Sequence, residues 1–243
     1  MTKTRQRVLV TGASKGIGRA IMTRLLAEGY EPVGLARTRP SDAAEGEVFH
    51  QVDLSDLQAT RETVAGLSSE APFYGLINNA AMAPTTSLTD CSIQDMEDSY
   101  LLNMTSPLVC TQAVLEGMKS LGAGRIINLS SRASLGKAGR TAYSAAKAGI
   151  LGMTRTWALE LAAAGITVNA IAPGPIATEL FRKSSPPDHP STQALMASVP
   201  VQRVGEPEEI AHAVAYLLDR RAGFTTGQTL YIDGGLTISA VRV

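Results

Sequence analysis

Short hydrophobic runs alternate along the chain with longer stretches in which hydrophobic residues recur every three or four positions. The runs predict strands, and the longer stretches predict amphipathic helices. The predicted strands cover residues 8–10, 31–36, 48–52, 75–78, 126–131, 166–172 and 229–232. The predicted helices cover residues 19–28, 57–68, 93–119, 141–163 and 207–218. Strands that alternate with helices pair in parallel, and no repeat or linker divides the chain, so we expect one α/β domain over residues 1–243.

The composition narrows the functional classes. The 22 basic and 22 acidic residues give a formal charge of zero, with no basic stripe or polybasic segment that favours nucleic acid or a membrane surface. The N-terminus leads into a strand without a signal peptide, and the hydrophobic runs are too short to cross a bilayer. We therefore expect a cytoplasmic protein whose partner is a small molecule.

Cysteine and histidine add no site of their own. Cys91 and Cys110, together with His50, His189 and His212, have neither the spacing of a metal site nor that of a disulfide framework. We interpret both cysteines as reduced and as packing residues, and we expect no metal.

A glycine-rich turn links the first strand to the first helix. Its sequence from Thr11 to Gly18, TGASKGIG, has the spacing Gly-x-x-x-Gly-x-Gly. Glycines permit a tight turn and a close approach of the backbone, and the free N–H groups at a helix N-terminus attract phosphate. The turn therefore predicts a dinucleotide site. The candidate cofactor-binding residues in it are Gly12, Ser14, Lys15, Gly16, Ile17 and Gly18.

The end of the second strand indicates which dinucleotide binds. A carboxylate there accepts hydrogen bonds from a ribose 2′-hydroxyl, whereas a basic residue accommodates a 2′-phosphate. The chain offers Ala36, Arg37 and Arg39, with Lys15 nearby in the glycine-rich turn, and no carboxylate. We therefore predict NADPH over NADH, with Arg37 at the phosphate; the alternative is that both arginines are solvated loop charges.

Polar residues follow two further strands and interrupt a helix. Asp53 follows the third strand, where its carboxylate can point to an adenine amino group. Asn78 and Asn79 end the fourth strand, and paired amides there more often hold neighbouring backbones together than touch substrate. Asn103 lies just before Pro107, which is expected to kink the helix at 93–119. We interpret Asn103 as a residue that bonds backbone or anchors water.

The fifth strand and the helix after it carry the strongest chemical signal. Ser130 and Ser131 end the strand, and Tyr143 and Lys147 are four positions apart on the helix, so the last two project from one face. An ammonium close to a phenol favours the phenolate and lowers the phenol pKa. Because ligands bind at the carboxyl ends of parallel strands, the hydroxyls, phenol and ammonium are expected to converge there and to exchange a proton with a carbonyl or alcohol.

The exit from the sixth strand is fixed by proline and glycine. Pro173 and Gly174 leave backbone groups at the height of the expected cofactor, and Ile176 and Thr178 follow. Prolines exclude a continuous helix over 179–199. We predict a substrate lid around residues 177–200, with a passive loop as the alternative.

Taken together, these motifs resemble the short-chain dehydrogenase/reductase family of the simple type of about 250 residues. The resemblance covers essentially the whole length. Its pieces are the TGASKGIG turn, Asp53-Leu54, Asn78-Asn79-Ala80, Asn103, Ser130-Ser131, Tyr143-x-x-x-Lys147, Pro173-Gly174 and Asp233-Gly234-Gly235. It implies a Rossmann-type, doubly wound, seven-stranded parallel sheet in a single domain, commonly assembled into homotetramers, with a dimer as the alternative.

The resemblance also implies roles for individual residues. Tyr143 would protonate the carbonyl oxygen, and Lys147 would bind the nicotinamide ribose and lower the phenol pKa. Ser131 would hydrogen-bond the substrate oxygen, with Ser130 as the alternative, and Asn103 would hold a water in the proton path. Cofactor contacts are implied for Leu54, Asn79, Ala80, Tyr143, Lys147, Pro173, Gly174, Ile176 and Thr178.

Two departures from the family pattern bear on substrate choice. Ala81 stands where glycine is frequent, and Ala164 stands where reductases of carrier-bound acyl substrates tend to have a basic residue, although Lys119 persists. Arg132 offers an anchor for an anionic or polar group of a small substrate. We therefore predict an NADPH-dependent oxidoreductase that acts on a ketone or secondary alcohol. The alternatives are a 3-oxoacyl-thioester reductase and a non-catalytic dinucleotide sensor; a nucleotide-sugar epimerase fits the length and glycine spacing less well.

Overall fold

The computed structural model describes residues 5–186 and 188–239. Its strands form one seven-stranded sheet, with every neighbouring pair parallel, in the order β3-β2-β1-β4-β5-β6-β7. The strands are β1 (Arg7–Thr11), β2 (Glu31–Ala36), β3 (Val48–Gln51), β4 (Gly75–Asn78), β5 (Gly124–Leu129), β6 (Ile166–Pro173) and β7 (Thr229–Ile232). The predicted α/β class and the parallel Rossmann-type sheet are confirmed.

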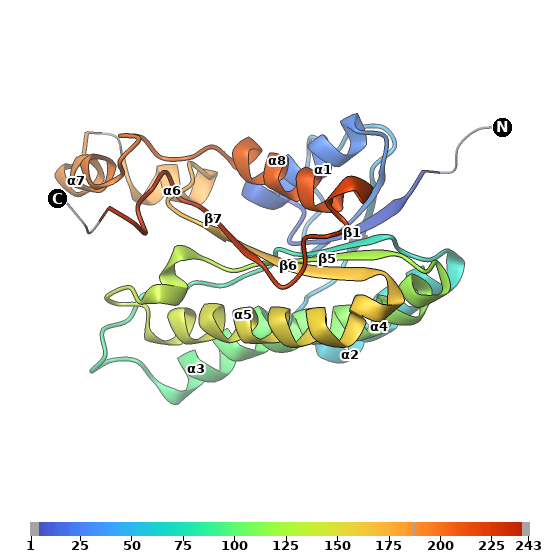
Figure 1. Cartoon of the computed structure of the whole chain (residues 1–243). Coiled ribbons are helices and arrows are strands. Elements are labelled where there is room, and N and C mark those ends of the chain that lie inside the picture. The colour runs from blue at the N-terminus through green and yellow to red at the C-terminus, as the bar shows by residue number, and fades with distance from the viewer. Residues whose placement is uncertain (1–4, 187, 240–243) are drawn as a thin grey trace.

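Helices cover both faces of the sheet (Figure 1). α1 and α8 lie on one face, and α2, α4 and α5 lie on the other. The helices are α1 (Gly16–Ala27), α2 (Leu57–Glu70), α3 (Ile93–Tyr100), α4 (Ser106–Ser120), α5 (Thr141–Leu161), α6 (Glu179–Ser184), α7 (Pro190–Ser198) and α8 (Pro207–Leu218). Among the described residues, no helix is both long and apolar enough to cross a membrane.

The core has one hydrophobic layer on each side of the sheet. Under α1 and α8, Ile21 and Leu25 meet Ile210 and Val214, all with no exposed surface. The second layer packs α2, α4 and α5 against the other face of the sheet. Each fully buried Leu or Ile side chain contributes about 1.5–3 kcal/mol to folding, so these two layers hold the strand ends in place.

The predicted helix at 93–119 is interrupted earlier than the sequence indicated. α3 ends at Tyr100, and Leu101–Thr105 forms a π-helical turn, labelled η1, before α4 begins at Ser106. Pro107 lies in the first turn of α4, directly after this π-helical turn, and a proline ring disturbs the carbonyl four residues before it, which is that of Asn103. The distortion therefore surrounds Asn103, just before the proline.

The fifth strand is displaced from its predicted bounds. It runs from Gly124 to Leu129, so Ser130 and Ser131 lie just beyond its last residue. The backbone N–H of Ser130 still donates to the carbonyl of Ile171 at 2.7 Å, so the first serine continues the pairing with β6. The second serine is the first free of the sheet, and its hydroxyl caps a short 3-10 turn, η2 (Arg132–Leu135).

Candidate active site

The glycine-rich turn forms a cradle that only glycine fits. At Gly12, where φ is +66°, an added Cβ would lie 2.9 Å from Ala80 Cα. At Gly18, an added Cβ would lie 2.1 Å from the carbonyl oxygen of Gly12. The backbone is thus folded on itself at the start of α1, where free N–H groups face the edge of the sheet. Such a cradle fits a dinucleotide phosphate.

Asn79 holds this turn against β4. Its Nδ2 donates to the carbonyls of Thr11 at 2.9 Å and Gly12 at 3.1 Å. The hydroxyl of Thr11 in turn accepts from the backbone N–H groups of Asn79 and Ala80. Sequence reasoning gave Thr11 no role, although a hydroxyl between a buried strand and a glycine pair is a recognisable signal. Asn79 and Ala80 therefore lie beside the cradle and shape it.

The three basic residues expected near the adenosine ribose lie on the surface. Lys15, Arg37 and Arg39 are exposed, and none of them forms an ion pair with another described residue. Arg19, by contrast, forms ion pairs with Glu47 at 2.7 Å and with Asp42 at 3.1 Å. The absence of an acidic residue at the end of β2 thus leaves positive charge at this corner of the site.

Asp53 lies at the end of the neighbouring strand β3. Its Oδ1 accepts hydrogen bonds from the backbone N–H of Ser55 at 3.0 Å and the Ser55 hydroxyl at 2.7 Å. These bonds, and more weakly the charge of Arg37, lower the pKa of Asp53. The group is therefore ionised and held as an acceptor, and Leu54 beside it is buried.

The exit from β6 lies against both the glycine-rich turn and the end of β7. An added Cβ at Gly174 would come within 2.7 Å of Asp233, and one at Gly16 within 3.2 Å of Thr178. Thr178 caps α6 by accepting from the N–H of Phe181 at 3.2 Å. Pro173 ends β6, and Ile176 is buried against the core, so this segment forms a wall beside the cradle.

The two serines have different partners, which separates their roles. The hydroxyl of Ser130 is buried and donates to the carbonyl of Lys147 at 2.7 Å. The hydroxyl of Ser131 lies close enough to the phenol of Tyr143 to oppose the rise that burial causes in the phenol pKa. It also accepts from the N–H of Ala133 at 3.1 Å, which fixes its direction. The structure therefore brings Ser131, and not Ser130, to the phenol.

Lys147 is completely buried beneath Tyr143. Its Nζ lies 5.8 Å from the centre of the Tyr143 ring and donates to the carbonyl of Leu129 at 2.6 Å. Burial lowers the pKa of Lys147 to about 7. Burial also raises the pKa of Tyr143, against the lowering effects of Ser131 and of the charge of Arg140. The net shift of the phenol pKa is therefore upward, opposite to the expected lowering, because desolvation of the phenol outweighs the effects of Ser131 and Arg140.

This burial predicts a pH dependence of stability. Between the folded pKa of Lys147, about 7, and its ordinary value of 10.5, the unfolded chain binds one more proton than the folded chain. Stability rises with pH wherever the unfolded state binds more protons, by about 1.4 kcal/mol per pH unit for one proton. The cost is thus fully present below pH 7 and is relieved above it.

We expect Lys147→Met to remove this slope. Urea unfolding at pH 7, 8 and 9 measures it, with the unaltered protein as reference. The variant should be relatively more stable at pH 7 and should lose that advantage by pH 9. Parallel curves for the two proteins would show that Lys147 does not titrate in this range.

Asn103 lies in the π-helical turn with one half of its amide unused. Its Nδ2 donates to the carbonyls of Ser99 at 3.0 Å and Met82 at 3.1 Å. Its Oδ1 is buried and has no hydrogen-bond partner among the described residues. Short π segments within helices frequently occur at functional sites. A buried, unpaired carbonyl is suited to accept a bond from water.

A buried polar chain supports the site from below. Asn78 Nδ2 donates to Asn128 Oδ1 at 2.8 Å, and Asn128 Nδ2 donates to the Thr154 hydroxyl at 2.9 Å. Thr154 then donates to the carbonyl of Ile150 within α5 at 2.8 Å. The interpretation of Asn78 as a residue that holds elements together agrees with these bonds. Asn128 and Thr154 were missed, because their pairing depends on how α5 packs on the sheet.

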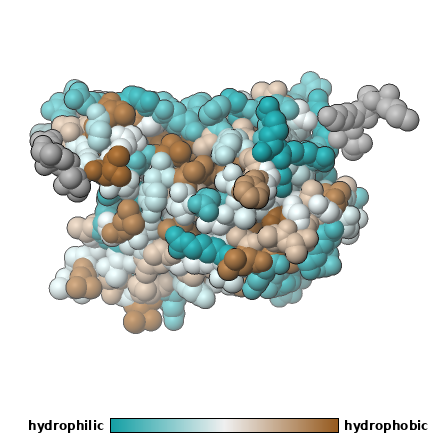
Figure 2. Space-filling model, in the orientation of Figure 1, coloured by the Kyte–Doolittle hydropathy of each residue, from teal (hydrophilic) through white to brown (hydrophobic). Residues whose placement is uncertain are grey.

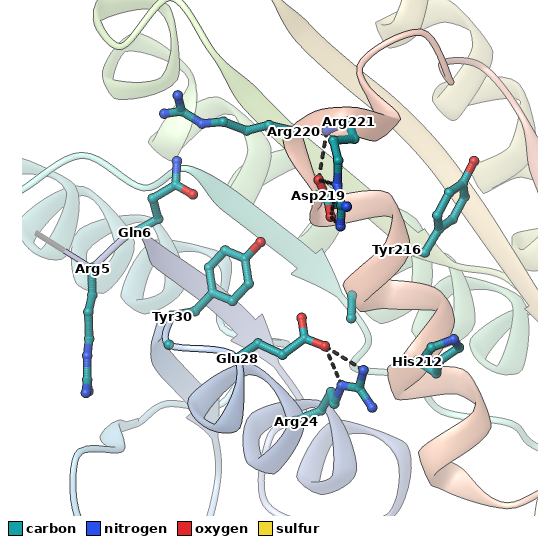
Figure 3. A pocket seen from close by; sticks show the side chains of 12 residues that line it. Arg5, Gln6, Arg24, Glu28, Tyr30, His212, Tyr216, Asp219, Arg220 and Arg221 are labelled. Atoms are coloured by element: carbon teal, nitrogen blue, oxygen red, sulfur yellow. Dashed lines mark hydrogen bonds and ion pairs between the residues drawn. The ribbon is translucent and has the colours of Figure 1, made fainter. Parts of the chain in front are cut away.

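A wide groove of ≈ 1080 Å³ lies at the opposite edge of the sheet (Figure 3). Its lining includes Gln6 beside β1 and Tyr30, which precedes β2, so it is at the amino ends of the strands. Its charged groups include an ion pair between Arg24 and Glu28 at 2.6 Å.

Within residues 5–186 and 188–239, no group of His, Cys, Asp or Glu side chains could hold a metal.

Comparisons with known proteins agree with this arrangement. The family profile described as Enoyl-(Acyl carrier protein) reductase matches residues 12–237. A 3-oxoacyl-[acyl-carrier-protein] reductase FabG from Vibrio harveyi is 36% identical, with 94% of this chain and 96% of that protein covered. An acetoacetyl-CoA reductase from Rhizobium meliloti (strain 1021) is 37% identical, with 93% and 96% covered.

Solved structures give the same result. A structure titled "short chain dehydrogenase/reductase family protein" matches with a TM-score of 0.84 and 36% identity, over 96% of this chain and 97% of that one. The structure of ElxO with NADP bound matches with a TM-score of 0.90 and 28% identity, over 97% and 100%. The resemblance found in the sequence motifs is confirmed. Because sequence and structure match over nearly the whole length, the chain belongs to the short-chain dehydrogenase/reductase family, a family of oxidoreductases.

Proposed function

We propose that this protein is an NADPH-dependent oxidoreductase that transfers a hydride between the cofactor and a ketone or secondary alcohol. The observation that carries the proposal is the meeting of the Ser131 hydroxyl, the Tyr143 phenol and the buried Lys147 amine at the carboxyl edge of the sheet. A binding module has no need of this group, so the arrangement favours an enzyme over a dinucleotide sensor.

The residues around the glycine-rich turn fit NADPH. The positive φ of Gly12 and the close packing at Gly18 leave the backbone open to phosphate, and Lys15 and Arg37 supply positive charge for the 2′-phosphate. We place the other predicted cofactor contacts at the same carboxyl edge of the sheet, among them Ser14, Ile17 and Thr178. When bound, the cofactor supplies the hydride. The relative ElxO was solved with NADP bound, which supports this assignment.

The protein's own groups then handle the proton. Ser131 donates a hydrogen bond to the substrate oxygen, and Tyr143 gives that oxygen its phenolic proton as the carbonyl is reduced. Lys147 lies beneath the phenol, where it can bind ribose hydroxyls, and in its protonated form it favours the phenolate. In the direction of oxidation, Tyr143 accepts the proton from the alcohol.

Asn103 completes the proton path in this proposal. Its buried, unpaired Oδ1 would accept a hydrogen bond from a water, which would replenish the proton that Tyr143 gives up. The π-helical turn serves this role, because it releases the amide from the regular helix.

The substrate is a small ketone rather than a carrier-bound acyl chain. Ala164, at the position of a frequent carrier anchor, packs against the core, and Lys119 is paired with Glu116 at 2.8 Å. Neither position offers a free cation to an acidic carrier. The second candidate is a 3-oxoacyl-thioester reductase, which is favoured by the FabG and acetoacetyl-CoA reductase relatives.

Turnover of a substrate panel tests these alternatives. Loss of NADPH absorbance is followed with simple ketones, diketones, cyclic ketones, acetoacetyl-CoA and a carrier-bound 3-oxoacyl thioester. A small ketone should be reduced at least as well as its thioester counterparts. A large advantage for the carrier-bound substrate would favour the second candidate, and tight NADPH binding without any turnover would favour the sensor.

Cofactor preference gives a separate prediction. Replacing Arg37 by Asp removes a cation and adds a carboxylate that repels a 2′-phosphate and accepts bonds from a 2′-hydroxyl. We expect the ratio of kcat/KM for NADPH to that for NADH to fall about 10- to 100-fold, since one charge-assisted hydrogen bond contributes about 1.5–3 kcal/mol. Arg155→Asp, at an exposed position on α5, is the matched control. An equal fall in both variants would assign the effect to net charge rather than to Arg37.

A lid over residues 177–200 belongs to the same proposal. α6 and α7 lie beyond the carboxyl end of β6 (Figure 1). A groove of ≈ 510 Å³ separates α6 from α1 and α8, and its lining includes Glu179 of α6, Thr23 of α1 and Glu208 of α8. Short helices are suited to open for the cofactor and to close over the substrate. Residue 187 of the predicted lid lies outside the described residues.

We further propose a homotetramer in the cytoplasm, with a dimer as the alternative assembly. Figure 2 shows hydrophobic residues exposed among polar ones on the face that carries α5 and β7. Leu159 on α5 is 85% exposed and Phe224 is 104% exposed, both large apolar side chains that a partner would cover. Cys91 and Cys110 are free thiols, as in a reducing compartment. Light scattering coupled to gel filtration measures the assembly directly.

A further inference from the structure

Three cationic side chains lie around the proposed catalytic hydroxyls. Arg132 follows Ser131 directly, Lys137 lies in the loop before α5, and Arg140 lies three positions before Tyr143. The turn η2, which carries Arg132, packs against α5 just after Arg140, and the loop with Lys137 joins the two. Burial lowers the pKa of Lys137, and the charges of Arg140 and Arg132 lower it further. Arg140 is also close enough to the phenol to lower the pKa of Tyr143. The mechanism above uses none of these charges.

No carboxylate compensates this cluster. Within residues 5–186 and 188–239, Arg132, Lys137 and Arg140 form no ion pair. This is unlike Arg19 and Arg203, which are both held by glutamates at 2.7 Å. Like charges brought together without a counter-ion repel one another, and a site lined by one sign of charge attracts ligands of the other sign.

Arg140 holds two loops together through hydrogen bonds to the backbone, which fixes its own position beside Arg132 and Lys137 in the chain. Its Nη1 donates to the backbone carbonyls of Ala83 and Pro84, in the loop that leaves β4. The N–H of Thr86 in that loop donates back to the carbonyl of Gly139 at 3.1 Å. Because β4 and β5 are neighbours in the sheet, these bonds tie together the loops that leave both strands at the site.

Arg132 and Lys137 do not hold the backbone of the described residues in this way. Their charged groups donate no hydrogen bond to any described residue, although Arg132 is half-buried next to Ser131. The guanidinium fork of an arginine matches the two oxygens of a carboxylate. The two side chains thus present positive charge on η2 and the loop after it, next to Ser131.

We propose that the substrate is a ketone that carries an anionic group, with Arg132 and Lys137 binding that group while Ser131 and Tyr143 act on the carbonyl. This inference rests on the proposed function. The anion is a carboxylate or phosphate on the small molecule itself. The same chemistry is present in the phosphates of a coenzyme A thioester, so the experiment distinguishes these two sources.

Matched pairs of substrates test the proposal. NADPH-dependent kcat/KM is measured for acetoacetate against methyl acetoacetate, for levulinate against methyl levulinate, and for acetoacetyl-CoA against the uncharged N-acetylcysteamine thioester. At low salt the acids should exceed their esters about tenfold, and added salt should reduce the advantage. Equal rates for acid and ester would overturn the proposal while leaving the reductase intact. An advantage seen only with the coenzyme A ester would also overturn it.

Two variants and a control locate the effect. Arg132→Gln and Lys137→Gln should each bring the ratio of acid to ester toward one. Arg155→Gln removes an equal charge from an exposed position on α5, about 18 Å along the helix from Tyr143, and should keep the ratio. A ratio that falls equally in all three variants would assign the preference to net charge and overturn the site.

Binding separates this inference from the proposed function. Calorimetric titration of the Tyr143→Phe variant, loaded with NADPH, compares levulinate with its ester without turnover. The acid should bind more tightly, and Arg132→Gln added to Tyr143→Phe should remove the difference. If the unaltered protein reduced no ketone and the acid still bound more tightly than its ester, the anion site would be supported and the proposed reductase function rejected.

Discussion

Tyr143→Phe should lower kcat/KM for ketone reduction by about 10²–10⁴-fold, the range that general acid catalysis commonly contributes. The substitution removes only the phenolic oxygen, so the ring continues to pack above Lys147. The dissociation constant of NADPH should change less than about threefold, because the phosphate cradle at Gly12 and Gly18 is distant in sequence and held by Asn79. Steady-state kinetics and a fluorescence titration with NADPH measure the two quantities.

The two serines provide the control for this result. Ser131→Ala removes the hydroxyl that is proposed to bind the substrate oxygen beside Tyr143 and should lower kcat about 10- to 100-fold. Ser130→Ala removes a buried hydrogen bond to the carbonyl of Lys147 and should mainly lower the free energy of unfolding, by about 1 kcal/mol. Near-normal turnover in Tyr143→Phe, or a larger loss of kcat at Ser130 than at Ser131, would contradict the assigned chemistry.

The fold was predictable because its signals are local. Buried strand runs and the glycine-rich turn each depend on a few adjacent residues, and the structure has them where the pattern placed them. The convergence of Ser131 and Tyr143 was predictable too, because the carboxyl ends of parallel strands meet at one edge. The strand boundary at Leu129, two residues before the predicted end, does not alter that geometry.

The properties that failed prediction depend on tertiary burial. The sequence shows that Tyr143 and Lys147 share a helix face, but not that the amine is buried deeply enough to lower its pKa to about 7. The helix interruption was predicted near Pro107 and occurs just before it, at Leu101–Thr105; its π-helical form was not predicted, because the bonds of Asn103 to Met82 and Ser99 come from packing. Uncompensated charge around Lys137 likewise emerges only when two loops are brought together.

The glycine-rich turn gives the other large expected effect. In Gly18→Ala, the new methyl group would lie 2.1 Å from the carbonyl oxygen of Gly12 and 2.6 Å from Asn79 Nδ2. Neither contact can be relieved by a small movement, because the Gly12 oxygen belongs to the backbone and the Asn79 amide holds β4 to the turn. We expect the free energy of unfolding to fall by about 1–3 kcal/mol, as for other overpacked sites, and NADPH affinity to fall more than about 100-fold.

Gly66→Ala is the matched control for this substitution. Gly66 lies on the exposed side of α2, and an added Cβ there meets nothing within 4 Å. Alanine is favoured over glycine within a helix by about 0.5–1 kcal/mol, so this variant should be slightly more stable and should bind NADPH normally. Urea unfolding and NADPH titration of both variants separate the cost of the methyl group from the loss of a glycine. If Gly18→Ala bound NADPH as tightly as Gly66→Ala, the cofactor would not lie against this turn, and the cradle would be a structural feature of the strand-to-helix junction alone.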